Sequence, residues 1–117
     1  RPVFLMDYPA SCASLSRLKP SDPAVAERVE LYAGGLELAN GFSELTDPRE
    51  QGDRFRRELQ RRKAQGLNAY PWPERFLSSL ERLPECAGMA LGIDRLVMLL
   101  TNASDIDEVV AFPPEEG

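Results

Sequence analysis

The sequence contains no histidine and only two cysteines among its 117 residues. Without histidine, neither a serine–histidine triad nor histidine acid–base catalysis is possible. Cys12 and Cys86 lie far apart and lack the short spacing of zinc ligands, so no zinc site is expected. We expect both thiols to be reduced, as in a cytoplasmic protein, with a single disulfide as the alternative.

Long hydrophobic runs are also missing. No stretch approaches the ~18–20 apolar residues that a membrane-spanning helix needs, so no membrane association is expected. The first residues lack the apolar core of a signal peptide, and the chain starts at Arg1 just before strand-like residues. We therefore expect part of a larger protein. The net charge of −5 argues against a general nucleic-acid coat protein.

The residues that are present predict one α+β domain. Short strands and helices alternate irregularly around a central hairpin, which favours an antiparallel β-sheet flanked by helices. Asp47 suits a helix N-cap, Pro48 the first helical position, and Glu50 a capping box. The expected strands are 3–6, 25–33, 36–45 and 86–91, with a turn at 19–23, and the expected helices are 48–65, 74–83 and 93–100. The expected core includes Phe4, Met6 and the five residues 96–100.

A glycine pair, Gly34-Gly35, predicts a two-residue hairpin turn, because glycine adopts positive φ at little cost. Such a turn places Tyr32 opposite Glu37 and Glu30 opposite Ala39. The two glutamates would then share one sheet face, about 7–8 Å apart between backbones. Two carboxylates beside substrate phosphates form a typical Mg²⁺ site. The alternative is an ordinary solvated face, on which glutamates are common.

Strict alternation would put Asn40, Phe42 and Glu44 on the other face of the hairpin. A β-bulge at Gly41 would change this, because a bulge reverses the alternation of side chains between the two faces, and strand glycines often mark bulges. We therefore predict a bulge at Gly41 that brings these three side chains beside the two glutamates.

A second motif is the strand GMALG, in which Gly88, Ala90 and Gly92 alternate with large apolar residues. One face of this strand therefore has almost no side-chain bulk, and a flat ligand can lie against its backbone. Arg95 follows at the start of a helix, where the helix dipole disfavours a cation. Its planar fork suits phosphate oxygens. The alternative is an internal Asp94–Arg95 charge pair and glycines kept for packing.

Together these stretches resemble a known family. GLELANGFSELTDP is similar to the amino-acid-binding strand of class II lysyl-tRNA synthetases, and GMALGIDRLVML to their motif 3, which holds ATP. The resemblance extends over nearly the whole chain, including the opening PVFLMDYPAS. Within that superfamily, DYPASCASL, ELTDPREQ and PECAGMALGIDRLVML most resemble the short synthetase-like ligases that modify elongation factor P. Lysyl-tRNA synthetases have glycine where this chain has Ala90, an exchange associated with accepting β-lysine.

The resemblance implies a role for each site residue. Glu30 and Glu37 would hold Mg²⁺–ATP, with Glu37 and Arg95 the catalytic groups. Leu38, Gly92 and Arg95 would contact the nucleotide. The lysine pocket would be formed by Asn40, Phe42, Glu44 and Ala90, with Glu44 pairing the substrate ammonium.

The implied reaction is activation of lysine or β-lysine by ATP and transfer to a lysine of elongation factor P. The chain would be the second half of the catalytic domain, residues 1–117. Motif 1, which builds the homodimer, and motif 2, with its α-phosphate arginine, are not found in it, so the chain alone should be inactive.

Three alternatives remain at this point. The chain can be the catalytic core of a true lysyl-tRNA synthetase that charges tRNA, or a synthetase-like regulator without catalysis. It can also be a nucleic-acid-binding module, because helix 49–63 holds seven of the 14 basic residues against three acidic ones. A solvated helix with salt-bridged pairs is the plainer interpretation of that helix, since no aromatic residue is interleaved for base stacking.

Overall fold

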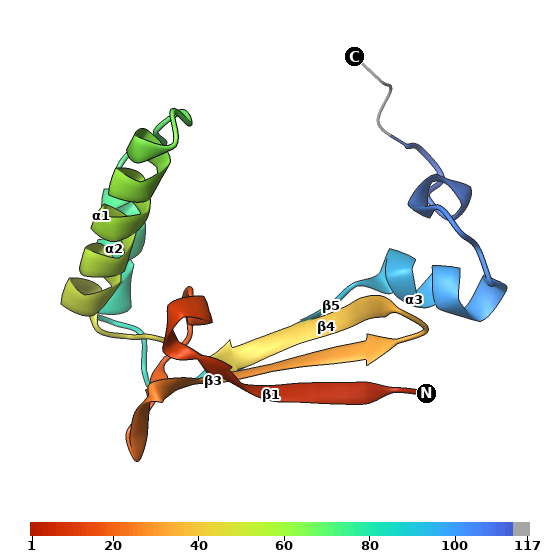
Figure 1. Cartoon of the computed structure of the whole chain (residues 1–117), viewed down its shortest axis with the longest axis horizontal. Helices are drawn as coiled ribbons and strands as arrows, with labels where there is room; N and C mark the ends of the chain where they lie inside the picture. Colours follow the sequence, from red (N-terminus) through yellow and green to blue (C-terminus); the bar gives the residue numbers. More distant parts are fainter. Residues whose placement is uncertain (114–117) are drawn as a thin grey trace.

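The computed structural model describes residues 1–113 and confirms an α+β fold with an antiparallel sheet flanked by helices (Figure 1). The strand order is β1-β3-β4-β5, and β2 pairs with β3 beside this path. The strands are β1 (Val3–Pro9), β2 (Leu18–Lys19), β3 (Asp22–Ala33), β4 (Leu36–Ser43) and β5 (Ala87–Leu91). The helices are α1 (Pro48–Ala64), α2 (Glu74–Leu80) and α3 (Ile93–Thr101), with short 3-10 turns at Ala10–Cys12 and Ile106–Glu108.

The hairpin between β3 and β4 turns where the glycine pair predicts. Gly34 and Gly35 have φ of +59° and +83°, and Ala33 pairs with Leu36 directly across the turn. Before it, β3 begins at Asp22, three residues earlier than expected, because Lys19 already pairs with Asp22 and the turn needs only two residues. The predicted turn at 19–23 is therefore too long.

Helix α1 begins as its sequence predicts and differs in one detail. The Asp47 carboxylate accepts hydrogen bonds from the backbone N–H groups of Arg49 and Glu50, and Pro48 is the first helical residue. The expected capping box is wrong, since the Glu50 carboxylate instead pairs with Arg54 at 2.6 Å. The helix ends at Ala64, and Gly66 has positive φ as a helix stop.

The helices cover only part of the sheet. α1 packs against α2, and this pair stands away from the strands, whereas α3 contacts β4 near the hairpin end (Figure 1). The radius of gyration is 17.2 Å, against about 13 Å for a compact domain of this length. No helix in residues 1–113 has the length and apolar character needed to cross a membrane.

Much of the expected core is exposed, which corrects the sequence prediction. Phe4 and Met6 are 61% and 67% exposed, and Leu100 is 77% exposed, while Met98 is buried. The reason is that β1 is an edge strand and that, of the α-helices in residues 1–113, α3 alone has several contacts to the sheet. An apolar surface of this kind is characteristic of an interface with further protein.

The backbone of Gly41 on β4 lies close to β5. A Cβ atom at this position would lie 2.9 Å from the Gly88 carbonyl oxygen and 3.0 Å from the Met89 side chain. We expect Gly41→Ala to lower the free energy of unfolding by about 1–3 kcal/mol, because β5 would have to shift. Gly52→Ala is the control, since the nearest atom there is 3.8 Å away and alanine favours a helix interior. Urea unfolding of both variants tests the prediction, which fails if the two behave alike.

Candidate functional site

A β-bulge organises the site, but at Leu38 and not at Gly41 as predicted. Tyr32 pairs with Glu37, and the next pair is Leu31 with Ala39, so Leu38 has no partner on β3. Its carbonyl oxygen accepts a hydrogen bond from the Gly92 N–H at 2.8 Å. The extra residue therefore reverses the alternation of β4 and also anchors the segment that leads into α3.

The bulge changes which residues face each other. Glu30 pairs with Asn40, not with Ala39 as predicted, and Arg28 pairs with Phe42. Because paired residues of antiparallel strands share a face, Glu37, Asn40 and Phe42 all join Glu30 on one face. The clustering predicted from the sequence is confirmed, although the residue that causes it is a different one.

Strand β5 supplies the bare floor beside this cluster. Ala90 pairs with Asn40 and Gly88 with Phe42, so both small residues lie on the same face. The Glu44 carboxylate extends over Gly88, since a Cβ there would lie 3.4 Å from Oε1 of Glu44. The predicted lysine-pocket residues, Asn40, Phe42, Glu44 and Ala90, therefore lie together. Leu38, for which the resemblance implies a contact with the nucleotide, has a buried side chain.

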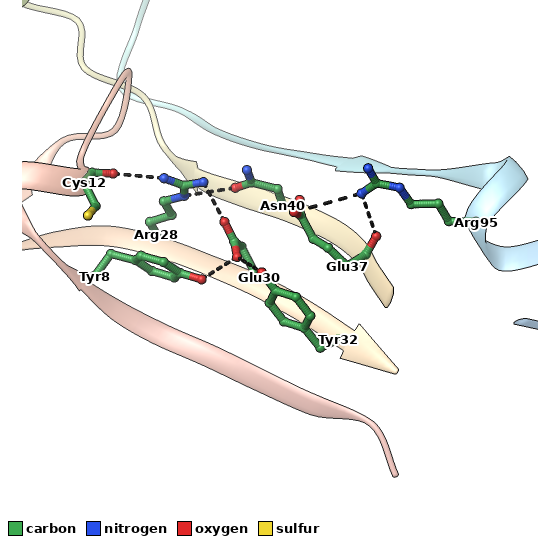
Figure 2. A network of polar contacts seen from close by, with 8 residues as sticks. All are labelled: Tyr8, Cys12, Arg28, Glu30, Tyr32, Glu37, Asn40 and Arg95. Atoms are coloured by element: carbon green, nitrogen blue, oxygen red, sulfur yellow. Dashed lines mark hydrogen bonds and ion pairs between the residues drawn. The ribbon is translucent and has the colours of Figure 1, made fainter. Parts of the chain in front are cut away.

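Arg95 closes the hairpin end of this face. Its Nη1 donates to the Glu37 carbonyl oxygen at 2.9 Å and lies 4.0 Å from the Glu37 carboxylate (Figure 2). Gly92 precedes it as the N-cap of α3. About half of the Arg95 side chain is exposed. The alternative pairing of Arg95 with Asp94 is wrong, since its ion-pair partner within residues 1–113 is Glu37.

Glu30 is the common acceptor of a hydrogen-bond cluster that the sequence pattern does not predict. Its carboxylate accepts hydrogen bonds from the hydroxyls of Tyr8 and Tyr32, the latter at 2.7 Å, and from Nη2 of Arg28 at 2.6 Å. The residue is only 5% exposed. Arg28 and Tyr32 could have been found from the sequence, because they lie two residues on either side of Glu30 on its face. Tyr8 comes from β1, and no local signal links it to Glu30.

These hydrogen bonds shift the proton affinities of the cluster. The Tyr8 hydroxyl is the main cause that lowers the pKa of Glu30, with Tyr32 and Arg28 adding to it and desolvation opposing it. Desolvation and the bond to Glu30 raise the pKa of Tyr8. Glu30 is therefore ionised and both tyrosines are neutral donors at neutral pH.

The fit of Mg²⁺ to this face differs between its two glutamates. Residues 1–113 contain no cluster of three or more acidic, cysteine or histidine side chains that can hold a metal by themselves. Mg²⁺ bound mainly through nucleotide phosphates needs only one or two carboxylates. Glu37 fits such a role because its side chain is partly exposed, whereas Glu30 would have to exchange one of its present hydrogen bonds.

Several basic side chains of helix α1 are paired with acidic or aromatic side chains of the same chain. Arg54 pairs with Glu50, Arg56 with Asp53 and Arg61 with Glu58. Arg56 and Arg62 also lie over the rings of Trp72 and Tyr70, at 5.5 Å and 5.4 Å. This arrangement agrees with a salt-bridged surface helix, and the two aromatic residues anchor the following loop to it.

Comparison with known proteins identifies the family to which this chain belongs. The family model described as class II tRNA synthetases (D, K and N) matches residues 1–116. The chain belongs to this family. Among its relatives are elongation factor P–(R)-β-lysine ligases of Proteus mirabilis, 53% identical over 97% of the chain, and of Vibrio cholerae, 50% identical over 96%. The same name is given to a protein of Hamiltonella defensa that is 52% identical over the whole chain.

The chain covers about a third of these relatives, namely 35%, 35% and 36% of their lengths. The antiparallel sheet with its flanking helices is consistent with a fragment of a class II tRNA synthetase domain. The resemblance inferred from the two motifs is therefore confirmed, including its closeness to the ligases that modify elongation factor P.

Proposed function

We propose that this chain is the C-terminal part of the catalytic domain of a ligase that activates lysine or β-lysine with ATP and attaches it to elongation factor P. The observation that carries the proposal is the single sheet face on which the Leu38 bulge gathers Glu37, Asn40 and Phe42 beside the bare strand β5. The names of the relatives support the acceptor protein and the β-lysine substrate. The full-length parent, meaning a protein of the relatives' length that contains this chain, would carry the activity.

The proposed reaction has two steps. A carboxylate oxygen of the amino acid attacks the α-phosphorus of ATP, and pyrophosphate leaves. The acyl group of the adenylate then passes to an amine of the acceptor protein, and AMP leaves. No side-chain nucleophile is needed, so positioning and charge neutralisation supply the catalysis.

The proposed roles of the residues follow their positions from the hairpin end of β4 to Glu44, which comes just after the strand. Glu37 and Arg95 lie at the hairpin end, where Arg95 would stabilise phosphate charge and Glu37 would bind nucleotide-linked Mg²⁺. Glu44 lies at the other end of the face and would pair the substrate ammonium. Asn40 lies between them, at the place where the substrate's carboxyl group would meet the α-phosphate. Magnesium, when bound, would neutralise charge on the phosphates.

The exposed apolar residues of β1 and α3 support further contacts in the full-length parent. We propose that they are covered by the rest of the parent and by its homodimer partner. We therefore propose that the isolated chain is inactive and that the parent acts in the cytoplasm. A true lysyl-tRNA synthetase remains the alternative, and Ala90 in the middle of β5 favours the ligase.

Substrate choice by the full-length parent tests this function. We expect ATP–pyrophosphate exchange that depends on (R)-β-lysine more than on α-lysine. Ala90→Gly should move the ratio toward α-lysine by about 10–100-fold, since one methyl group in a pocket discriminates by about 1–3 kcal/mol. Ala87→Gly is the control, because Ala87 lies on the same strand but on the opposite face.

The comparison of acceptors completes the experiment. Transfer of the activated amino acid to elongation factor P, and not to tRNA, is the expected result. Strong preference for α-lysine, with no effect of Ala90→Gly and efficient charging of tRNA, would replace the ligase by a lysyl-tRNA synthetase. A parent without any exchange activity would be a regulator.

A further inference from the structure

Arg28 links two residues of the proposed site, Glu30 and Asn40. Its guanidinium donates Nη2 to Glu30 at 2.6 Å, Nε to the Asn40 side-chain oxygen at 3.3 Å, and Nη1 to the Cys12 carbonyl at 2.9 Å (Figure 2). The Arg28 side chain is 19% exposed and lies 4.8 Å from the centre of the Tyr8 ring. One rigid group therefore joins β3, β4 and the loop after β1.

This geometry decides which way the Asn40 amide points. A carboxamide has an oxygen that accepts and an NH₂ group that donates, whereas guanidinium only donates. The Asn40 oxygen must therefore face Arg28, since the opposite orientation would set donors against donors. Figure 2 shows the amide nitrogen directed away from Arg28.

We infer that Arg28 is a positioning residue that turns the Asn40 amide so that its NH₂ group faces the carboxylate of the amino-acid substrate. The inference rests on the proposed function and extends it to a residue outside the substrate contacts. Asn40 lies between the nucleotide end and the ammonium end of β4, where the substrate presents acceptor oxygens. A freely turning amide would offer its own oxygen there part of the time and repel them.

Arg28→Lys in the full-length parent tests the positioning role. Lysine keeps the charge, but its single ammonium cannot span three partners on three elements. We expect the KM for the amino acid to rise about 10–100-fold, the range for losing a hydrogen bond to a charged group, while the KM for ATP changes less than about twofold. Arg17→Lys is the matched control, because Arg17 makes a similar pair with Glu27 at 2.9 Å on the opposite face.

A double-mutant cycle separates positioning from general structural damage. If Arg28 acts through Asn40, Arg28→Lys should raise the KM by less than about threefold when Asn40 is already alanine. The full 10–100-fold effect in that background would overturn the inference. Normal exchange with an unchanged KM in Arg28→Lys would also overturn it and leave the proposed function intact, whereas a wild-type parent without exchange overturns both.

Asn40→Asp is a second variant that does not depend on how Arg28→Lys folds. Aspartate can still accept from Arg28, but it cannot donate to a substrate carboxylate. We expect a folded protein whose affinity for the amino acid, measured by calorimetry, falls at least tenfold. Unchanged affinity would show that the amide NH₂ does not face the substrate, and the inference would fall.

Discussion

Arg95→Ala should slow amino-acid-dependent ATP–pyrophosphate exchange by the full-length parent about 10²–10³-fold. Arg95 lies at the start of α3, where its Nη1 contacts the Glu37 carbonyl and about half of the side chain is exposed. A preorganised cation beside phosphate charge that develops in the transition state typically contributes an effect of this size. The measurement is kcat for exchange at saturating ATP and amino acid.

Two controls make this result specific to Arg95. Arg95→Lys should recover part of the rate, because a point charge replaces the planar fork. Arg82→Ala should leave exchange unchanged, since Arg82 is exposed in the turn after α2, away from the site. Exchange at the wild-type rate in Arg95→Ala would mean that this guanidinium does not contact the reacting phosphates.

Glu30→Ala should lower the free energy of unfolding by about 3 kcal/mol at neutral pH, near the lower end of the range for breaking a buried ion pair. It would leave Arg28 and the hydroxyls of Tyr8 and Tyr32 without their common acceptor. Glu27→Ala is the control and should cost about 1 kcal/mol or less, because its pair with Arg17 is more exposed. Urea unfolding measures both.

The effect of Glu30 should depend on pH in a defined direction. Because folding lowers the pKa of this carboxyl group, its stabilisation is complete above the ordinary value of about 4.3. It is lost as the pH falls through the lowered value in the folded protein. The difference between wild type and Glu30→Ala should therefore shrink in acid. A difference that stays constant down to the acid transition would contradict the account of the Glu30 cluster.

Local signals in the sequence predicted the elements, and long-range pairing decided the details. The Gly34-Gly35 turn and the Asp47-Pro48 start of α1 depend on backbone preferences that each residue carries with it, and both are confirmed. The sequence predicts the bulge at Gly41, because strand glycines commonly mark bulges. Here the glycine instead allows close approach of β5, and the bulge is stabilised at Leu38 by a hydrogen bond from Gly92, a residue distant in the sequence.

The candidate site could be predicted as a set of residues but not as a network. The motifs identified the residues of β4 and β5, and the register brings them to one face. The partners of Glu30 could not all be predicted, because Tyr8 reaches it from β1 and no local signal in the sequence links the two residues. The expected core at Phe4 and Met6 was wrong because the sequence shows apolar residues without showing what covers them.

In the proposed function, one face of this sheet holds both a nucleotide and a lysine-type amino acid. The affinity of the full-length parent for a non-hydrolysable lysyl-adenylate analogue with a sulfamoyl linker tests this shared site. If the two halves share a site, the analogue should bind at least about 100-fold more tightly than lysine or ATP, because the second half binds intramolecularly. Glu37→Gln and Glu44→Gln should each weaken it. If the analogue binds no more tightly than the tighter-binding of lysine and ATP, and only one of the two substitutions weakens it, the shared site is contradicted.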